Sequence, residues 1–192
     1  MKKVILFASG GGSNAAQIIH YAQKSGSYTV AAIFTNNPEA GVIKKAEDSG
    51  IDTIVFTREE LQNGTVLQQV NGINPALIVL AGFLWKFPSD IIAAYRSRVI
   101  NIHPALLPNY GGKGMYGKHV HKAVFDNKDI ESGITIHYVN DNYDEGNIIL
   151  QKTVAIDRCE TPEAVALKVL ELEHEYLPRV IESLVNNNNT SL

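Results

Sequence analysis

Asn101 and His103 stand two positions apart at the end of a short apolar segment, and Pro104 follows them directly. Residues two apart in a strand share one face, so the amide and the imidazole are expected to point the same way. In open α/β sheets, ligands bind outside the carboxyl ends of the strands. The pair therefore predicts either a ligand-binding centre or a hydrogen-bonded pair that stabilises the Pro-containing loop after it.

A second group of polar residues is the acidic segment 140–146, which reads Asn-Asp-Asn-Tyr-Asp-Glu-Gly. An EF-hand begun at Asp141 would put Tyr143 at its second ligand position, and one begun at Asn140 would put Glu145 where glycine is required. A calcium loop is therefore excluded. Two interpretations stay open: a solvated acidic turn, or a turn from which one carboxylate reaches His103 and stabilises its protonated form.

The third candidate is the loop 9–14, Ser-Gly-Gly-Gly-Ser-Asn, between an apolar segment and a helical pattern. Glycines let backbone N–H groups approach a ligand, and a helix N-terminus favours an anion. No Lys-Ser or Lys-Thr follows as in a nucleotide P-loop, and Thr35-Asn-Asn37 stands where a dinucleotide fold needs an acid. The pattern favours a monophosphate site over a tight turn capped by Ser13 or Asn14.

Glu173 interrupts the apolar stripe of the last helical segment. A carboxylate needs a partner if it is buried there, because burying it unpaired is costly. From its position alone, an edge site whose carboxylate bends out to water is favoured over a substrate contact. Other patterns are rejected: His119, His121 and His137 complete no known metal-ligand spacing. Ser9 and Ser13 lack the Gly-x-Ser-x-Gly elbow of a hydrolase.

These residues must be held by elements that the hydrophobic pattern predicts. Short apolar strands are expected at 4–8, 28–35, 53–56, 77–81 and 99–103, and further strands at 134–139 and 148–154. Helical spacing alternates with them at 15–22 and near 41–49, 59–71, 89–95 and 118–127, and a final helix starts at Thr161-Pro-Glu163. Alternating strands and helices predict an α/β fold, a doubly wound, mainly parallel sheet with helices on both faces. Residues 104–117 form a long loop.

Bulk properties limit the possible functions. The 192 residues predict one domain, with a phosphate-binding half (1–100), a second half (101–185) and a frayed tail (186–192). A net charge of −3 argues against nucleic acid as a partner. The single cysteine excludes an internal disulfide and a multi-cysteine zinc site, and no apolar run is long enough for a membrane helix. The chain is expected to be cytoplasmic, and its oligomeric state, monomer or homodimer, stays open.

Taken together, five segments resemble the glycinamide ribonucleotide formyltransferase family of purine biosynthesis, in order and over nearly the whole chain. They are Ser9–Asn14, Ala81-Gly-Phe83, Asn101-Ile-His-Pro-Ala-Leu-Leu-Pro108, His137 and Asp144-Glu-Gly-Asn-Ile-Ile-Leu-Gln151. The Asn-x-His-Pro-x-Leu-Leu-Pro element is shared by all folate-dependent formyltransferases. The glycine loop is the part that points to a ribonucleotide phosphate, so it favours this family over its relatives.

The resemblance implies a reaction and its catalytic residues. The formyl group of 10-formyltetrahydrofolate, a cosubstrate, would pass to the amine of glycinamide ribonucleotide, with no metal. Asn101 and protonated His103 would stabilise the oxyanion. Asp144 would hold His103 in its protonated form and assist a water-mediated proton transfer.

The resemblance also implies binding residues. Gly11, Gly12, Ser13 and Asn14 would hold the substrate phosphate, and Glu173 the ribose. The folate would contact a group of mostly aromatic and polar side chains: Phe83, Leu84, Trp85, Phe87, Asn140, Asp141 and Tyr143. The chain departs from the family pattern at 84–88 and in a loop, 111–117, that is several residues longer. The alternatives are a formyltransferase for another amine, formyltetrahydrofolate hydrolase, and a non-catalytic phosphate-binding module.

Overall fold

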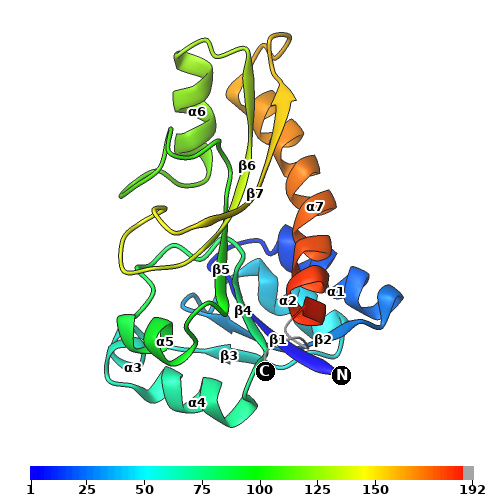
Figure 1. The fold of residues 1–192 in the computed structure, drawn as a ribbon, viewed down its shortest axis with the longest axis vertical. Helices are drawn as coiled ribbons and strands as arrows, with labels where there is room; N and C mark the ends of the chain where they lie inside the picture. Colours follow the sequence, from blue (N-terminus) through cyan, green and yellow to red (C-terminus); the bar gives the residue numbers. More distant parts are fainter. Residues whose placement is uncertain (188–192) are drawn as a thin grey trace.

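The computed structural model describes residues 1–187, and within them one seven-stranded sheet has the order β3-β2-β1-β4-β5-β6-β7 (Figure 1). β1 to β5 pair in parallel, whereas β6 and β7 are antiparallel to their neighbours. The strands are β1 (Lys2–Phe7), β2 (Tyr28–Thr35), β3 (Thr53–Val55), β4 (Leu77–Leu80), β5 (Val99–His103), β6 (Glu131–Tyr138) and β7 (Ile148–Ala155). The predicted α/β fold with a mainly parallel sheet is confirmed.

Helices cover both faces of the sheet. They are α1 (Ser13–Ser25), α2 (Gly41–Asp48), α3 (Arg58–Gln62), α4 (Thr65–Ile73), α5 (Ser89–Ala94), α6 (Lys118–Asp126) and α7 (Pro162–Asn187). In β1, Val4 and Leu6 belong to the core under α1 and α7, while Ile5 and Phe7 belong to the core under α4 and α5. This alternation follows from the two-residue period of a strand, and it explains why a strand covered on both faces is a continuous apolar run.

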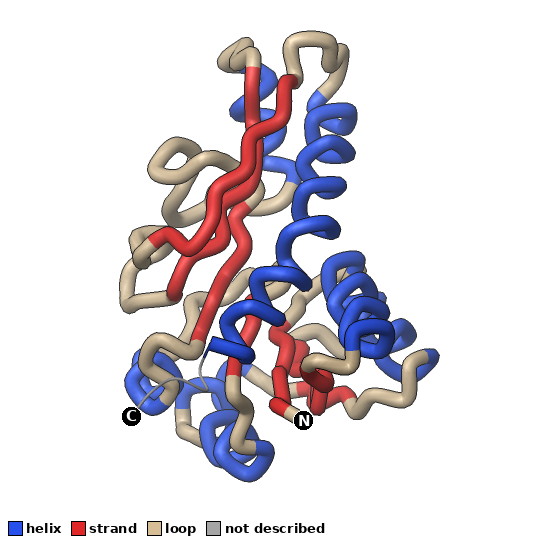
Figure 2. The backbone as a smooth tube through the Cα atoms, turned by 45° about the vertical axis from the view of Figure 1, so that its right-hand side comes forward, coloured by secondary structure: helices blue, strands red, loops and turns tan. Residues whose placement is uncertain are grey.

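The two longest helices of one face form as their sequences predict. In α1, the helically spaced Ala15, Ile18, Ile19 and Ala22 are all buried. The first turn of α7 is capped by Thr161, whose hydroxyl accepts a hydrogen bond from the Ala164 amide at 3.2 Å. Figure 2 shows α7 running along the strands, where it packs against β6 and β7 as well as α1. One helix thus connects the late strands to the glycine loop that starts α1.

Several predicted boundaries were wrong. The helix predicted at 59–71 is two helices, α3 and α4, because the chain turns at Gly64 with a φ of 88°. β6 starts at Glu131, three residues before the predicted strand. Asn186 and Asn187 of the predicted frayed tail belong to α7, while residues 188–192 lie outside the described part.

The sheet order places a topological switch at β1 and β4, from which the chain proceeds in opposite directions. A crevice forms at the carboxyl ends of strands at such a point. The loops after these two strands are tied together, because the Ser9 amide donates to the Gly82 carbonyl at 3.1 Å and the Leu84 amide donates to Ser9 Oγ at 3.0 Å. The fold therefore brings the glycine loop, the segment after β4 and the end of β5 to one edge.

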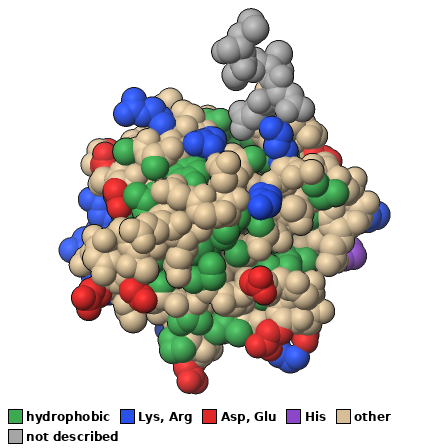
Figure 3. Space-filling model, turned by 90° about the horizontal axis from the view of Figure 1, so that it is seen from below, with side chains coloured by type: hydrophobic (Ala, Val, Ile, Leu, Met, Phe, Trp, Pro, Cys, Tyr) green, Lys and Arg blue, Asp and Glu red, His purple; other side chains and the backbone are tan. Residues whose placement is uncertain are grey.

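The surface and the helices add two observations. On the face drawn in Figure 3, Lys and Arg side chains and Asp and Glu side chains occur singly or in small groups, which gives no continuous basic surface there. Among the helices of residues 1–187, none combines the length and the apolar character needed to cross a membrane.

Candidate active site

The first part of the site is the start of α1. Gly12 precedes the helix with a φ of 70°, and no side chain caps the first turn, so the predicted alternative of a cap from Ser13 or Asn14 is not found. A Cβ on Gly12 would lie 2.5 Å from Val42 Cγ2, so a side chain has no room there. The turn needs glycine for both reasons. An uncapped helix N-terminus leaves backbone N–H groups for an anion.

Glu173 of α7 lies beside this loop. Its side chain is only 9% exposed, and its Oε2 accepts a hydrogen bond from Asn14 Nδ2 at 2.6 Å. The interpretation of Glu173 as a water-exposed edge residue is therefore wrong. Burial raises the pKa of Glu173 to about 7, although the bond from Asn14 acts to lower it. Asn14 Oδ1 is buried without a hydrogen-bond partner among the described residues. Both side chains thus present polar atoms that a ligand can satisfy.

The raised pKa of Glu173 predicts how stability depends on pH. The folded protein binds the proton more tightly than the unfolded chain, whose glutamate has the ordinary value of 4.5. Stability from this group is therefore fully present below pH 4.5 and is lost as the pH rises through about 7. The difference between the two pKa values, 4.5 and about 7, corresponds to roughly 3 kcal/mol in the free energy of unfolding. Glu173→Gln should remove this loss, as urea unfolding at pH 5 and pH 8 would show. Glu171→Gln, on the exposed side of α7, should keep the wild-type pH dependence.

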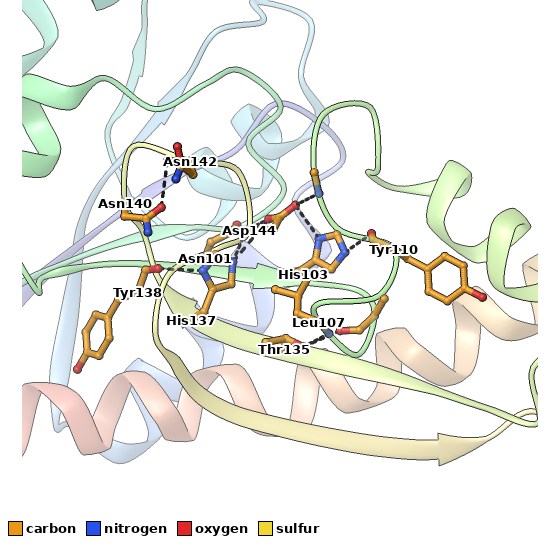
Figure 4. A network of polar contacts seen from close by, with 12 residues as sticks. Asn101, His103, Leu107, Tyr110, Thr135, His137, Tyr138, Asn140, Asn142 and Asp144 are labelled. Atoms are coloured by element: carbon orange, nitrogen blue, oxygen red, sulfur yellow. Dashed lines mark hydrogen bonds and ion pairs between the residues drawn. The ribbon is translucent and has the colours of Figure 1, made fainter.

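The second part of the site forms where β5 pairs with β6. The register sets Asn101 opposite His137 and His103 opposite Thr135. His137 Nδ1 donates to the Tyr138 carbonyl at 2.9 Å, so its Nε2 is an acceptor in the neutral ring and lies 3.2 Å from Asn101 Nδ2 (Figure 4). This contact orients the Asn101 amide, whose Nδ2 also lies 3.5 Å from Asp144 Oδ1. His137, which was rejected as a metal ligand, therefore belongs to the site as a hydrogen-bond partner.

His103 is buried and is held through its Nε2. Its Nε2 lies 2.8 Å from the Tyr110 carbonyl, which can only accept, so Nε2 carries a hydrogen. Nδ1 lies 3.6 Å from Asp144 Oδ2, too far for a direct hydrogen bond. Burial lowers the pKa of His103, against the Asp144 carboxylate and the Tyr110 carbonyl, which both act to raise it. In this geometry the imidazole is therefore neutral at neutral pH, contrary to the expectation that Asp144 keeps His103 protonated.

Asp144 lies at the tip of the turn between β6 and β7 with a φ of 57°. Its Oδ2 accepts a hydrogen bond from the Gly112 amide at 2.9 Å. Burial acts to raise the pKa of Asp144, but the nearby His137 and His103 rings and the bond from the Gly112 amide together bring it below its usual value. Asp144 is therefore ionised at neutral pH. Of the acids in segment 140–146, it is the one that contacts the Asn101–His103 pair.

A cavity of about 650 Å³ joins these parts. The three predicted catalytic residues line it together, and Asn14 and Glu173 line it beside the glycine loop. Gly11, Gly12 and Ser13 do not line it, although Gly10 and Asn14 do on either side of them. All seven predicted folate residues line it: Phe83, Leu84, Trp85, Phe87, Asn140, Asp141 and Tyr143. Phe87 is 4% exposed and stacks edge to face against Phe7, so it is chiefly a core residue.

Several lining residues were not predicted as site residues. Gly112 to Gly117 of the long loop line the cavity, and the Gly112 amide contacts Asp144. His121 of α6 also lines it, is buried, and has Nδ1 without a hydrogen-bond partner in the described residues; burial lowers its pKa. In residues 1–187, no group of three or more His, Cys, Asp or Glu side chains is arranged to hold a metal ion. Sequence spacing could not reveal His121, because only the packing of α6 turns it to the cavity.

Comparison with known proteins extends these observations. A family model described as formyl transferase matches residues 2–181. Phosphoribosylglycinamide formyltransferase from Bacillus subtilis is 33% identical over 98% of the chain and 97% of its own length. The chloroplastic protein of the same name from Arabidopsis thaliana is 37% identical over 95% of the chain. The chain spans 65% of the length of the Arabidopsis relative and 61% of that from Vigna unguiculata.

Solved structures agree with the sequence matches. The crystal structure of phosphoribosylglycinamide formyltransferase from Brucella melitensis superposes with a TM-score of 0.86 at 34% identity, covering 96% of this chain and 95% of that chain. That from Bacillus halodurans gives a TM-score of 0.85 at 32% identity and covers the same shares. Because the family model matches residues 2–181 and the fold is shared with these structures, the chain belongs to the formyl transferase family.

Proposed function

We propose that the protein transfers the formyl group of 10-formyltetrahydrofolate to the amine of glycinamide ribonucleotide, which gives formylglycinamide ribonucleotide and tetrahydrofolate in purine biosynthesis. The names of the relatives support this reaction. The observation that carries it is one cavity with two chemically different parts. Asn101, His103 and Asp144 converge at its centre, and Asn14 and Glu173 lie beside an uncapped helix N-terminus.

Asn101 and His103 act on the oxyanion that forms when the amine attacks the formyl carbon. The Asn101 amide, oriented by His137, donates a hydrogen bond to that oxygen as charge develops. The Tyr110 carbonyl fixes the hydrogen of His103 on Nε2, so Nδ1 is the atom that takes up a proton from water before the amine attacks. Once protonated, Nδ1 becomes a charged donor to the oxyanion.

Asp144 stabilises the positive charge that His103 gains with this proton. Its carboxylate is 3.6 Å from His103 Nδ1, a distance at which it favours the imidazolium by Coulomb attraction while leaving Nδ1 free for the substrate. A water molecule beside the carboxylate carries a proton from the attacking amine to the departing folate nitrogen. The low pKa of Asp144 suits this role, because the carboxylate stays charged before His103 gains its proton.

The two ends of the cavity then bind the two substrates. The backbone amides of Gly11, Gly12, Ser13 and Asn14 hold the phosphate of the ribonucleotide, and Glu173 accepts a hydrogen bond from its ribose. The pterin of the folate packs against Phe83, Leu84 and Trp85 and takes polar contacts from segment 140–144. We further propose a cytoplasmic enzyme, a monomer or a homodimer.

An absorbance assay of tetrahydrofolate formation tests the reaction. Release of tetrahydrofolate should require both the protein and glycinamide ribonucleotide. Equal release without the ribonucleotide would replace the proposal with formyltetrahydrofolate hydrolase, and release with a different amine only would assign another acceptor. Trp85 is the only tryptophan of the sequence and lines the cavity, so its fluorescence reports folate binding independently of turnover.

A further inference from the structure

Tyr110 connects the reacting centre to a part of the protein outside it. Its backbone carbonyl accepts the hydrogen of His103 Nε2 at 2.8 Å, and its hydroxyl donates to Asp129 Oδ2 at 2.6 Å. Asp129 lies between α6 and β6, where its Oδ1 accepts a further bond from Asn127 Nδ2 at 2.8 Å. Figure 4 shows the Tyr110 ring directed away from His103 while its carbonyl faces the imidazole. The backbone of Tyr110 therefore contacts the His103 imidazole, while its side chain contacts the turn between α6 and β6.

We propose that the Tyr110–Asp129 hydrogen bond is a positioning device: it holds the Tyr110 carbonyl against His103 Nε2 and so keeps Nδ1 directed at the reacting centre. The proposal rests on the function proposed above and assigns that function a residue whose side chain does not contact the reacting atoms.

The backbone of Tyr110 needs such an anchor. Its φ is 56°, in the left-handed region, which costs a residue with a side chain on the order of 1 kcal/mol and persists only where the surroundings impose it. The loop before it is held separately, because the Leu107 amide donates to Thr135 Oγ1 at 3.0 Å and Gln151 Nε2 donates to the Leu107 carbonyl at 2.8 Å. After it, the Gly112 amide is held by Asp144. Between these attachments, the hydroxyl bond to Asp129 orients the Tyr110 side chain, and the Asn127 amide, itself bonded to Asp129, lies beside that hydroxyl.

The charges around His103 decide the direction of the expected change. Asp144, from the β6–β7 turn, raises the pKa of His103, whereas His137 of β6 lowers it. A positive charge on His103 also lowers the pKa of His121 of α6, because the two imidazolium charges would repel. The Tyr110 carbonyl adds a neutral acceptor that favours the imidazolium. If the carbonyl moves away, one of the contacts that raise the pKa of His103 is lost. Burial then lowers that pKa further. The imidazolium needed at the oxyanion then forms less readily.

Tyr110→Phe removes the hydroxyl and keeps the ring and the backbone. We expect kcat near neutral pH to fall about tenfold, the usual order for losing a hydrogen bond to a charged group, with KM for both substrates within about twofold. The His103 imidazole signal, assigned in NMR spectra by comparison with His103→Gln, should titrate about half a pH unit lower than in the wild type. The alkaline limb of the kcat profile, which reports a group needed in its protonated form, should shift in the same direction.

Matched variants separate positioning from a general loss of structure. Tyr21→Phe removes an equivalent bond, from a tyrosine hydroxyl to Glu182 Oε2 at 2.5 Å, in a distant part of the fold. It should leave kcat and the His103 titration unchanged. Asp129→Ala should reproduce Tyr110→Phe, whereas Asp129→Asn keeps an oxygen acceptor and should restore most of the activity.

Two results would overturn the proposal: an unchanged His103 titration in Tyr110→Phe, or equal losses of kcat in Tyr110→Phe and Tyr21→Phe. The titration needs no substrate. If the wild type fails to make tetrahydrofolate, the proposed function fails, while the NMR comparison still decides whether Tyr110 positions His103.

Discussion

His103→Ala is expected to lower kcat on the order of a thousandfold, because it removes a hydrogen-bond donor to the developing oxyanion together with the positive charge of the imidazolium. The ring is buried with Nδ1 directed between Asp144 and the cavity, and water entering the space cannot reproduce that fixed geometry. Affinity for folate should change little, because the proposed apolar contacts of the pterin lie on Phe83, Leu84 and Trp85, away from His103 in the sequence and in the cavity lining. Steady-state kinetics and Trp85 fluorescence measure the two effects separately.

The control for this substitution is His20→Ala, which removes an exposed imidazole of α1 and should retain wild-type kcat. A His103→Ala enzyme that keeps a tenth or more of wild-type kcat would show that His103 is a structural partner of the Pro-containing loop. That was the alternative interpretation of the Asn101–His103 pair.

Gly12→Ala is expected to produce the largest effect on the phosphate site. The new methyl would lie 2.5 Å from Val42 Cγ2 and 2.9 Å from Val42 Cα, and the residue has a φ of 70°. Because a backbone atom is among the close neighbours, the loop itself must move. We expect a loss of about 2 kcal/mol in the free energy of unfolding and a KM for the ribonucleotide raised about tenfold or more. Urea unfolding and initial-rate kinetics measure these changes.

Gly10→Ala is the matched control in the same loop. Its new Cβ would meet no atom within 4 Å and its φ is not positive, so stability should stay close to that of the wild type. Equal unfolding midpoints and equal KM values for the two variants would contradict the assignment of residues 11–14 to the phosphate, because the loop shape would then not matter.

Much of the fold follows from local patterns. Strands buried on both faces are continuous apolar runs, so β2 and β5 were predicted at their observed bounds. The boundary at Gly64 was missed because a single glycine does not by itself end a helical pattern, while the left-handed conformation of that glycine separates α3 from α4. Periodicity reports which face is buried, and it does not report where the backbone turns.

In the site, too, local sequence patterns predicted some features and missed others. The spacing of Asn101 and His103 determined that they share a face, because strand residues alternate, and the glycines of loop 9–14 predicted the sharp turn that leads into α1. Only the tertiary structure decided the partners. Antiparallel register set His137 opposite Asn101, the β6–β7 turn brought Asp144 to His103, and the packing of α7 on α1 joined Glu173 to Asn14 across 159 positions of sequence. These contacts depend on strand register and helix packing between distant segments, which no local pattern of side chains encodes.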